Sequence, residues 1–155
     1  MQTGKAQKRL STEFQSLSVD TVCGSTIILE DENNLFNWTV IMQGPDSTPY
    51  EGGIFNLQFK FPDNYPFKPP EVKFLTTVYH PNIKLDTGEI CQDVFANGWA
   101  PTQKVQDILE KLVSMLREPC TSSPLENQIC ELFINQREQF NKNAREHTQK
   151  YAVMK

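Results

Sequence analysis

Three side chains that together could transfer an acyl group lie in one stretch of this sequence, between His80 and Pro101. Cys91 carries a thiol nucleophile, Asn82 carries a neutral amide that can donate a hydrogen bond, and Asp93 carries a carboxylate close to the thiol. A nucleophile, a donor for the charge that develops on a carbonyl oxygen and a group that receives a proton are the parts of an acyl-transfer site. The residue types therefore indicate cysteine-based acyl transfer.

The stretch that holds these residues shows few signs of regular secondary structure. Pro81, Gly88, Gly98 and Pro101 interrupt any helix, and a strand-like alternation is confined to residues 89–91. A loop of roughly twenty residues inside a compact domain is uncommon and tends to be functional. The sequence thus predicts that the site lies on a long loop.

Two other kinds of cysteine site fit the sequence poorly. A cysteine protease needs a histidine base beside the thiol, and the chain has 2 histidines, His80 and His147. His147 falls on the apolar side of the last predicted helix, which favours packing, and His80 is held by the proline that follows it. A zinc site would have only His80 and Cys91, at no recognised ligand spacing, so no metal is expected.

The composition indicates one folded domain. The chain has 155 residues, 38% hydrophobic and 22% charged, which suits a single globular domain over residues 1–155. Its net charge of −4 does not favour binding to nucleic acid, and no apolar run approaches the roughly 18 residues that would insert in a membrane. Because the N-terminus is polar and lacks a signal-peptide pattern, we expect a cytoplasmic or nuclear protein in which Cys23, Cys91, Cys120 and Cys130 remain thiols.

Hydrophobic periodicity predicts a helix followed by four strands. Residues 2–18 are expected to form an amphipathic helix with Ala6, Leu10, Phe14 and Leu17 on its apolar side. Alternating apolar residues then predict strands near residues 26–29, 36–40, 55–59 and 72–75. The short turns between them favour an antiparallel meander over a wound parallel sheet.

The period changes after Trp99, where apolar residues recur at helical spacing. A helix of about fourteen residues is predicted, ending before Pro119 and burying one wide stripe against the sheet; the stripe consists of Val105, Ile108, Leu109, Leu112, Val113 and Leu116. Two further helices are expected around residues 129–133 and 140–151. The predicted fold is α+β: a four-stranded antiparallel meander with an N-terminal helix, a central helix packed on the sheet and two C-terminal helices.

Several motifs occur together in an order that resembles one family. They are HPN at 80–82, GEIC at 88–91 with Trp99 and Pro101 after it, YPFKPP at 65–70, and GP at 44–45 followed by TPYEGG at 48–53. This arrangement, which covers roughly residues 10–151, resembles the ubiquitin-conjugating enzymes. The order of predicted elements is also that of the fold of this family.

The resemblance implies a two-step reaction at Cys91. The thiol would accept the C-terminal carboxyl of ubiquitin from the thioester of a ubiquitin-activating enzyme, and a lysine of a protein substrate or the cysteine of a ubiquitin ligase would then attack it. The exchange is between thiols, so the cysteine need not be strongly acidic. No cofactor would bind the chain directly, because ATP is consumed by the activating enzyme.

The resemblance also assigns roles to the neighbours of the cysteine. Asn82 would either hydrogen-bond the oxyanion or order the loop that does so, and Asp93 would position or activate the incoming lysine. His80, Pro81 and Trp99 would be structural. Near the thioester the chain departs from the family at two positions: Ser123 stands where many relatives have an acidic residue, and Gln92 stands where an apolar one is usual.

A partner surface is implied at two places. Lys5, Lys8 and Arg9 on the first helix would contact the activating enzyme and ligases, although a solvated basic face explains them equally well. Phe67 and Pro101 would lie on two neighbouring loops that ligases hold, since exposed aromatic residues make good anchors.

The sequence points to two branches of the family. The segment KLDTGEIC at 84–91 and the SPL at 123–125 resemble the peroxisomal branch, whereas NAREHTQKYA at 143–152 resembles the general one. The general branch is favoured. The alternative is an enzyme on the cytosolic face of the peroxisomal membrane, held by a membrane anchor protein. A ubiquitin-like modifier in place of ubiquitin, or a mainly non-catalytic binding partner, also stays open.

Overall fold

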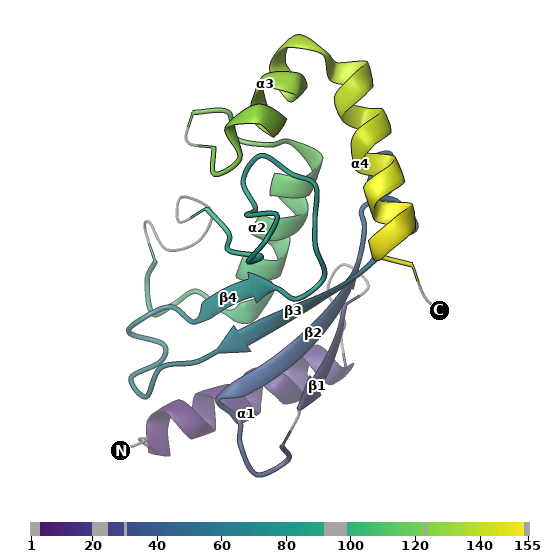
Figure 1. Cartoon of the computed structure of the whole chain (residues 1–155). Coiled ribbons are helices and arrows are strands. Elements are labelled where there is room, and N and C mark those ends of the chain that lie inside the picture. The colour runs from purple at the N-terminus through teal and green to yellow at the C-terminus, as the bar shows by residue number, and fades with distance from the viewer. Residues whose placement is uncertain (1–3, 20–24, 30, 92–98, 123, 154–155) are drawn as a thin grey trace.

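A computed structural model describes residues 4–19, 25–29, 31–91, 99–122 and 124–153, and Figure 1 shows how their helices and strands are arranged. The elements follow the predicted order of one helix, four strands and three helices. They are α1 Gly4–Val19, β1 Thr26–Leu29, β2 Asn37–Gln43, β3 Ile54–Lys60, β4 Glu71–Phe74, α2 Val105–Arg117, α3 Asn127–Asn135 and α4 Arg137–Tyr151. The predicted α+β class is confirmed.

The four strands form one antiparallel sheet in the order β1-β2-β3-β4, as predicted. Directly opposed apolar residues of β2 and β3 share the buried face, among them Trp38 with Phe59 and Val40 with Leu57. Two boundaries differ from the prediction. Residue 36 is buried but precedes β2, and β4 ends at Phe74, one residue earlier than expected.

The central helix α2 lies across the face of the sheet on which these apolar residues gather (Figure 1). Its stripe is buried as predicted, except that Val113 is only half-buried. The helix begins where the Asp107 carboxylate accepts a hydrogen bond from the backbone N–H of Lys104 at 2.8 Å. It ends at Arg117, shortly before Pro119, which cannot continue a helix.

The first helix buries an unexpected residue. Ala6, Leu10 and Leu17 are buried as predicted, but Phe14 is only half-buried and the charged Glu13 is buried with them. The apolar pattern of the sequence gave no sign of this carboxylate, because a glutamate counts as polar in any periodicity. It bears on the partner surface described below.

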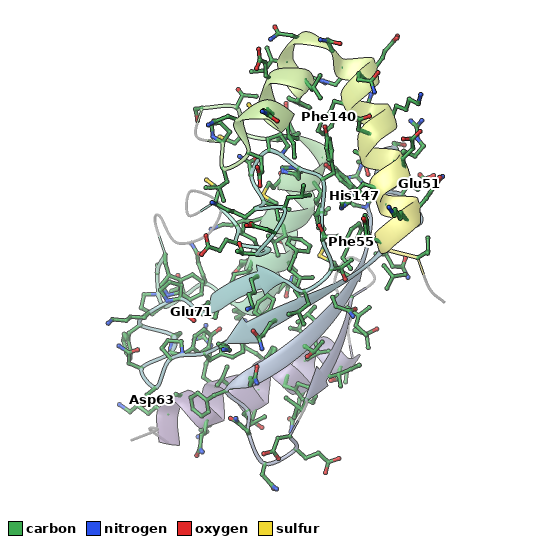
Figure 2. All side chains as sticks on the ribbon, in the orientation of Figure 1. Glu51, Phe55, Asp63, Glu71, Phe140 and His147 are labelled. Atoms are coloured by element: carbon green, nitrogen blue, oxygen red, sulfur yellow. The ribbon has the colours of Figure 1, made fainter. Side chains whose placement is uncertain are left out.

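The two C-terminal helices pack against the rest of the chain through aromatic rings. Figure 2 shows Phe140 and His147 on the side of α4 that faces the molecule. The ring of Phe140 lies 5.1 Å from that of Phe133 on α3 and 5.7 Å from that of Tyr79. The His147 Nε2 lies 3.2 Å from the Thr77 hydroxyl, and its ring packs against those of Tyr79 and Tyr151, as expected of a packed histidine. No described helix combines the length and apolar character needed to cross a bilayer.

A glycine holds the loop of the candidate site against the sheet. Gly88 has a φ of 79°, a conformation that side chains rarely adopt, and a Cβ at this position would overlap the carbonyl oxygen of Phe74. That close approach lets the Phe74 N–H donate to the Gly88 carbonyl at 2.9 Å. The residues that follow Gly88 toward Cys91 are therefore anchored to β4.

We predict that Gly88→Ala destabilises the protein by more than Gly52→Ala. Gly52 also has a positive φ, of 85°, but open space where a Cβ would lie, so its variant should cost about 1–2 kcal/mol in free energy of unfolding. Gly88→Ala should cost at least about 1 kcal/mol more, because the loop must also move away from β4. Urea unfolding of both variants measures the difference, and equal losses would show that the approach to Phe74 is not required.

Candidate active site

The segment from His80 to Cys91 is more regular than the sequence predicted. Isolated antiparallel bridges pair His80 with Ile83 and Ile83 with Ile90. At its end, the Cys91 N–H donates to the Asn82 carbonyl at 2.9 Å. The segment thus lies outside the named helices and strands, but isolated bridges and hydrogen bonds fold it back on itself and join Cys91 to Asn82.

His80 is fully buried beneath this segment. Its Nδ1 accepts a hydrogen bond from the Asn82 N–H at 2.9 Å, so the proton must reside on Nε2, which lies 2.9 Å from the Met115 carbonyl oxygen of α2. Burial lowers the pKa of His80 to about 4, and the hydrogen bond with Met115 only partly offsets this. A neutral histidine committed at both nitrogens is not available as a base for Cys91.

Asn82 joins the segment of Cys91 to the chain beyond α2. Its side chain has no exposed surface, its Nδ2 donates to the Cys120 carbonyl at 2.8 Å, and its Oδ1 accepts the Cys120 N–H at 2.9 Å. The side-chain amide therefore pairs with the backbone of Cys120 as a residue of a neighbouring β-strand would, and both its donor and its acceptor are used. Of the two roles considered for Asn82, this geometry supports ordering of the loop.

Pro81 extends the same connection. Its carbonyl oxygen accepts the N–H of Leu125 at 2.9 Å and that of Glu126 at 3.1 Å. The Glu126 carboxylate in turn accepts the N–H of Leu85 at 2.8 Å. Three consecutive residues, His80 to Asn82, thus tie the segment of Cys91 to α2 and to the start of α3.

Cys91 lies at the end of this anchored segment with 5% of its surface exposed. It is a reduced thiol, as are Cys120 and Cys130. Asp93, Gln92, Ser123 and Cys23 fall outside the described residues, so the structure does not place them relative to the thiol. Among the residues that it does describe, no group of three histidine, cysteine or acidic side chains is arranged to hold a metal ion.

A hollow of about 510 Å³ adjoins the segment next to Cys91. Its lining includes Ile90, the neighbour of the cysteine, and Leu125. Charged residues of both signs complete it, among them Glu89 and Lys73.

The residues expected to contact partner proteins differ in exposure. Lys5, Lys8 and Pro101 are exposed, and Phe67 exposes 68% of its surface, which is unusual for a phenylalanine. Arg9 is different: its Nε donates to the Glu13 carboxylate at 2.7 Å and its Nη2 donates to the Gln103 carbonyl at 2.8 Å. Its guanidinium is thus engaged within the protein.

Sequence reasoning missed Glu13, whose carboxylate connects three parts of the chain. Oε2 accepts the Tyr65 hydroxyl at 2.6 Å and the Arg9 Nε–H, and Oε1 accepts the N–H of Val105 at 2.8 Å. Burial and this carboxylate both raise the pKa of the Tyr65 hydroxyl, which remains a donor. The signal available in the sequence was the i, i+4 spacing of an arginine and a glutamate, which is common on exposed helix faces.

The comparisons with known proteins agree on one family. Residues 9–148 match the family model described as "Ubiquitin-conjugating enzyme". An Arabidopsis thaliana protein named "Probable ubiquitin-conjugating enzyme E2 31" is 42% identical over 148 residues, 96% of this chain and 94% of that protein. "Ubiquitin conjugating enzyme E2 B" of Dictyostelium discoideum is 40% identical over 149 residues, 95% of this chain and 98% of that protein. "Protein PEROXIN-4" of A. thaliana is 40% identical over 126 residues, 81% of this chain and 79% of that protein.

Solved structures give the same result. A Plasmodium yoelii protein assigned to the ubiquitin-conjugating enzymes superposes with a TM-score of 0.91 at 32% identity, covering 100% of both chains. The E2 domain of a Toxoplasma gondii ubiquitin-conjugating enzyme superposes with a TM-score of 0.86 at 31% identity, covering 94% of this chain and 98% of that one.

We predict that Asn82→Ala lowers the free energy of unfolding by about 2–3 kcal/mol. It removes two hydrogen bonds and leaves both backbone groups of Cys120 without their partner. Asn82→Asp should be worse at pH 7, because a carboxylate faces the Cys120 carbonyl, and should recover as the pH falls and the carboxyl becomes able to donate. Chemical unfolding at pH 7 and pH 5 tests both variants, with the exposed Asn33→Ala as control; no loss for Asn82→Ala would contradict the anchoring role.

His80 is expected to make stability depend on pH. The pKa of His80 in the folded protein, about 4, lies below the usual value of 6.5, so the unfolded chain binds the proton more tightly. This contribution is complete above about pH 6.5 and is lost as the pH falls toward 4, by up to roughly 3 kcal/mol. Unfolding free energies of wild type and His80→Gln across this range should diverge in slope. His147→Gln, at a half-buried histidine, should alter the slope less, and parallel curves for wild type and His80→Gln would refute the assignment.

Proposed function

Because this chain belongs to the ubiquitin-conjugating enzyme family, we propose that Cys91 carries ubiquitin as a thioester between an activating enzyme and a substrate lysine. The Cys91 sulfur attacks the carbonyl carbon of the incoming thioester, and the cysteine of the activating enzyme leaves as a thiolate. A lysine amine then attacks the new thioester, an amide bond forms, and the Cys91 sulfur leaves. The transferase activity follows from the family, whereas the thioester on this cysteine is our assignment.

The observation that carries this assignment is the anchoring of Cys91. Its N–H is bound to Asn82, and Asn82 is bound to Cys120 through a buried amide. A nucleophile in a fixed position supports transfer between two large proteins, because orientation reduces the entropic cost of reaching the transition state. We propose that Asn82 contributes by holding this geometry, and that Asp93 positions the incoming lysine.

The remaining assignments concern partners. The family implies ubiquitin, an activating enzyme and a ligase as partners. We assign ligase binding to Phe67 and Pro101, and contact with the activating enzyme to Lys5 and Lys8. Arg9 was expected to act with these two lysines, but its guanidinium is hydrogen-bonded to Glu13 and Gln103. We therefore assign it to holding the partner surface in place and not to direct contact with a partner. No cofactor is assigned to the chain itself, since the activating enzyme consumes the ATP.

A peroxisomal role is a second candidate, favoured by one observation. The relative "Protein PEROXIN-4" matches this chain at 40% identity, and its name is that of a peroxisomal protein. The segment 84–91 resembles that branch. Under this alternative a membrane anchor protein would hold the enzyme on the cytosolic face of the peroxisome. The general assignment, to the cytoplasm or nucleus, is supported by E2 relatives that match at similar identity over more of the chain.

Three variants at one position test the thioester. With activating enzyme, ATP and ubiquitin, the wild type should form an adduct that a thiol reductant removes. Cys91→Ser should form an adduct that resists the reductant, because an oxygen ester does not undergo thiol exchange, and Cys91→Ala should form none. Non-reducing gels with and without reductant separate these products.

Two controls make this test decisive. Cys130→Ser, at another buried thiol, should charge as the wild type does. Parallel reactions with ubiquitin-like modifiers and their own activating enzymes should give no adduct. An undiminished adduct on Cys91→Ala would overturn the assignment, and charging with another modifier instead of ubiquitin would replace the cargo but keep the cysteine.

A further inference from the structure

The buried carboxylate of Glu13 lies where α1, the loop of Phe67 and the start of α2 meet. Only 5% of the residue is exposed, yet its two oxygens accept hydrogen bonds from Arg9, Tyr65 and Val105. The Val105 N–H belongs to the first turn of α2, where the helix dipole favours a negative charge. One side chain therefore fixes the distance between three elements that are far apart in the sequence.

Two of these contacts lead directly to the exposed residues of the partner surface. Tyr65 is separated from Phe67 by one residue, and Val105 begins the helix that follows Pro101 in the chain. The two loops are also joined to each other, since the Trp99 indole N–H donates to the Pro66 carbonyl at 2.8 Å. The rings of Tyr65 and Trp99 pack at 6.2 Å.

Arg9 completes the arrangement from the side of α1. Its Nη2 donates to the Gln103 carbonyl, two residues after Pro101, and its guanidinium lies 5.8 Å from the centre of the Tyr65 ring. Arg9 thus contacts the same two loops that Glu13 contacts. Arg9 and Glu13, which carry opposite charges on α1, therefore both contact the loop of Phe67 and the segment that leads from Pro101 into α2.

We propose that Glu13 is a positioning residue of the ligase-binding surface: its carboxylate sets the placement of Phe67 relative to Pro101. The proposal rests on the ligase-binding role assigned above to these two residues. Glu13 itself, being buried, would not touch the ligase. Its effect would pass through Tyr65 to one loop and through Val105 to the other.

A purely stabilising role is the competing explanation, and the physics does not favour it. Bringing a carboxylate and a guanidinium out of water costs about as much as their attraction returns, and apolar residues in such positions are often as stable. What an apolar side chain could not do is accept hydrogen bonds from a hydroxyl and a backbone N–H at defined angles. The geometry that Glu13 imposes is thus its distinctive contribution.

The first experiment uses the protein alone. In Glu13→Gln an NH₂ replaces one of the two acceptor oxygens. At the Oε1 position it cannot accept the Val105 N–H, and at the Oε2 position it cannot accept from Arg9 and reverses the hydrogen bond with Tyr65, so the three-way arrangement is broken in either orientation. We expect the Trp99 indole signal to shift and its N–H to exchange with solvent faster by NMR, at least roughly fivefold. Tyr65→Phe should reproduce this change, and Glu131→Gln, at an exposed glutamate of α3, should not. The side-chain amide signals of Asn82, which report on the distant anchor of Cys91, should stay in place.

The second experiment measures how strongly a ligase domain binds the charged protein and accelerates its discharge. The probe is a RING domain selected because it accelerates discharge of ubiquitin-charged wild type onto free lysine. Glu13→Gln should raise the RING concentration needed for half-maximal acceleration roughly five- to tenfold, while the rate at saturation falls much less. A merely destabilised protein would instead lose both together.

A double-mutant comparison connects Glu13 to Phe67. If Glu13 acts through Phe67, then Glu13→Gln should add little to the loss caused by Phe67→Ala, whereas independent effects would multiply. The proposal is overturned if the Trp99 signals do not change in Glu13→Gln or if the two losses multiply. By contrast, a Phe67→Ala variant that binds the RING domain normally would overturn the assigned surface, and the NMR result would still report on Glu13.

Discussion

The described structure of the active-site segment depends on a pair of hydrogen bonds between one side chain and the backbone N–H and C=O of one residue. Asn82 gives its amide N–H to the Cys120 carbonyl and takes the Cys120 N–H in return, across 38 positions of sequence. Neither group of Asn82 reaches solvent. At neutral pH few side-chain groups of this size present a donor and an acceptor side by side as an amide does, so the position is poorly replaced by other residues. Cys91 is held through the backbone of the same asparagine.

The neighbouring histidine explains why this arrangement works without a buried charge. His80 accepts at Nδ1 and donates at Nε2, which requires the neutral ring, and burial keeps it neutral at physiological pH. The segment of Cys91 thus contains a histidine whose two ring nitrogens are both used in hydrogen bonds to other groups. The proposed thiol exchange would not need a histidine base, since the incoming ubiquitin would already be an activated acyl group. Under this proposal the chain contributes placement, and the chemical driving force comes with the substrate.

The sequence predicted the fold well because the fold follows from local periodicity. The strand alternation of β2 and β3 and the stripe of α2 each repeat within a few residues, so each can be recognised without knowing its partner. Asn82 was recognised as important, but its partner Cys120 was not, because nothing near either residue indicates a pairing over such a separation. The hydrogen bond between Arg9 and Glu13 was not foreseen for a related reason. A glutamate and an arginine one helical turn apart usually face solvent, and Glu13 is buried here because Tyr65 and the start of α2 pack over it.

Two separate sets of hydrogen bonds hold the two regions that the proposed reaction uses, the segment of Cys91 and the ligase-binding surface. Asn82 and His80 connect the cysteine to α2 and to the segment before α3, whereas Glu13 connects the exposed Phe67 to α1 and to the start of α2. Helix α2 therefore takes part in both sets of hydrogen bonds, through Met115 near its C-terminal end and through Val105 at its N-terminal end. A ligase bound at Phe67 and Pro101 would lie on loops that Glu13 joins to the first turn of this helix, whereas the segment of Cys91 is joined to the last turn through His80 and Met115.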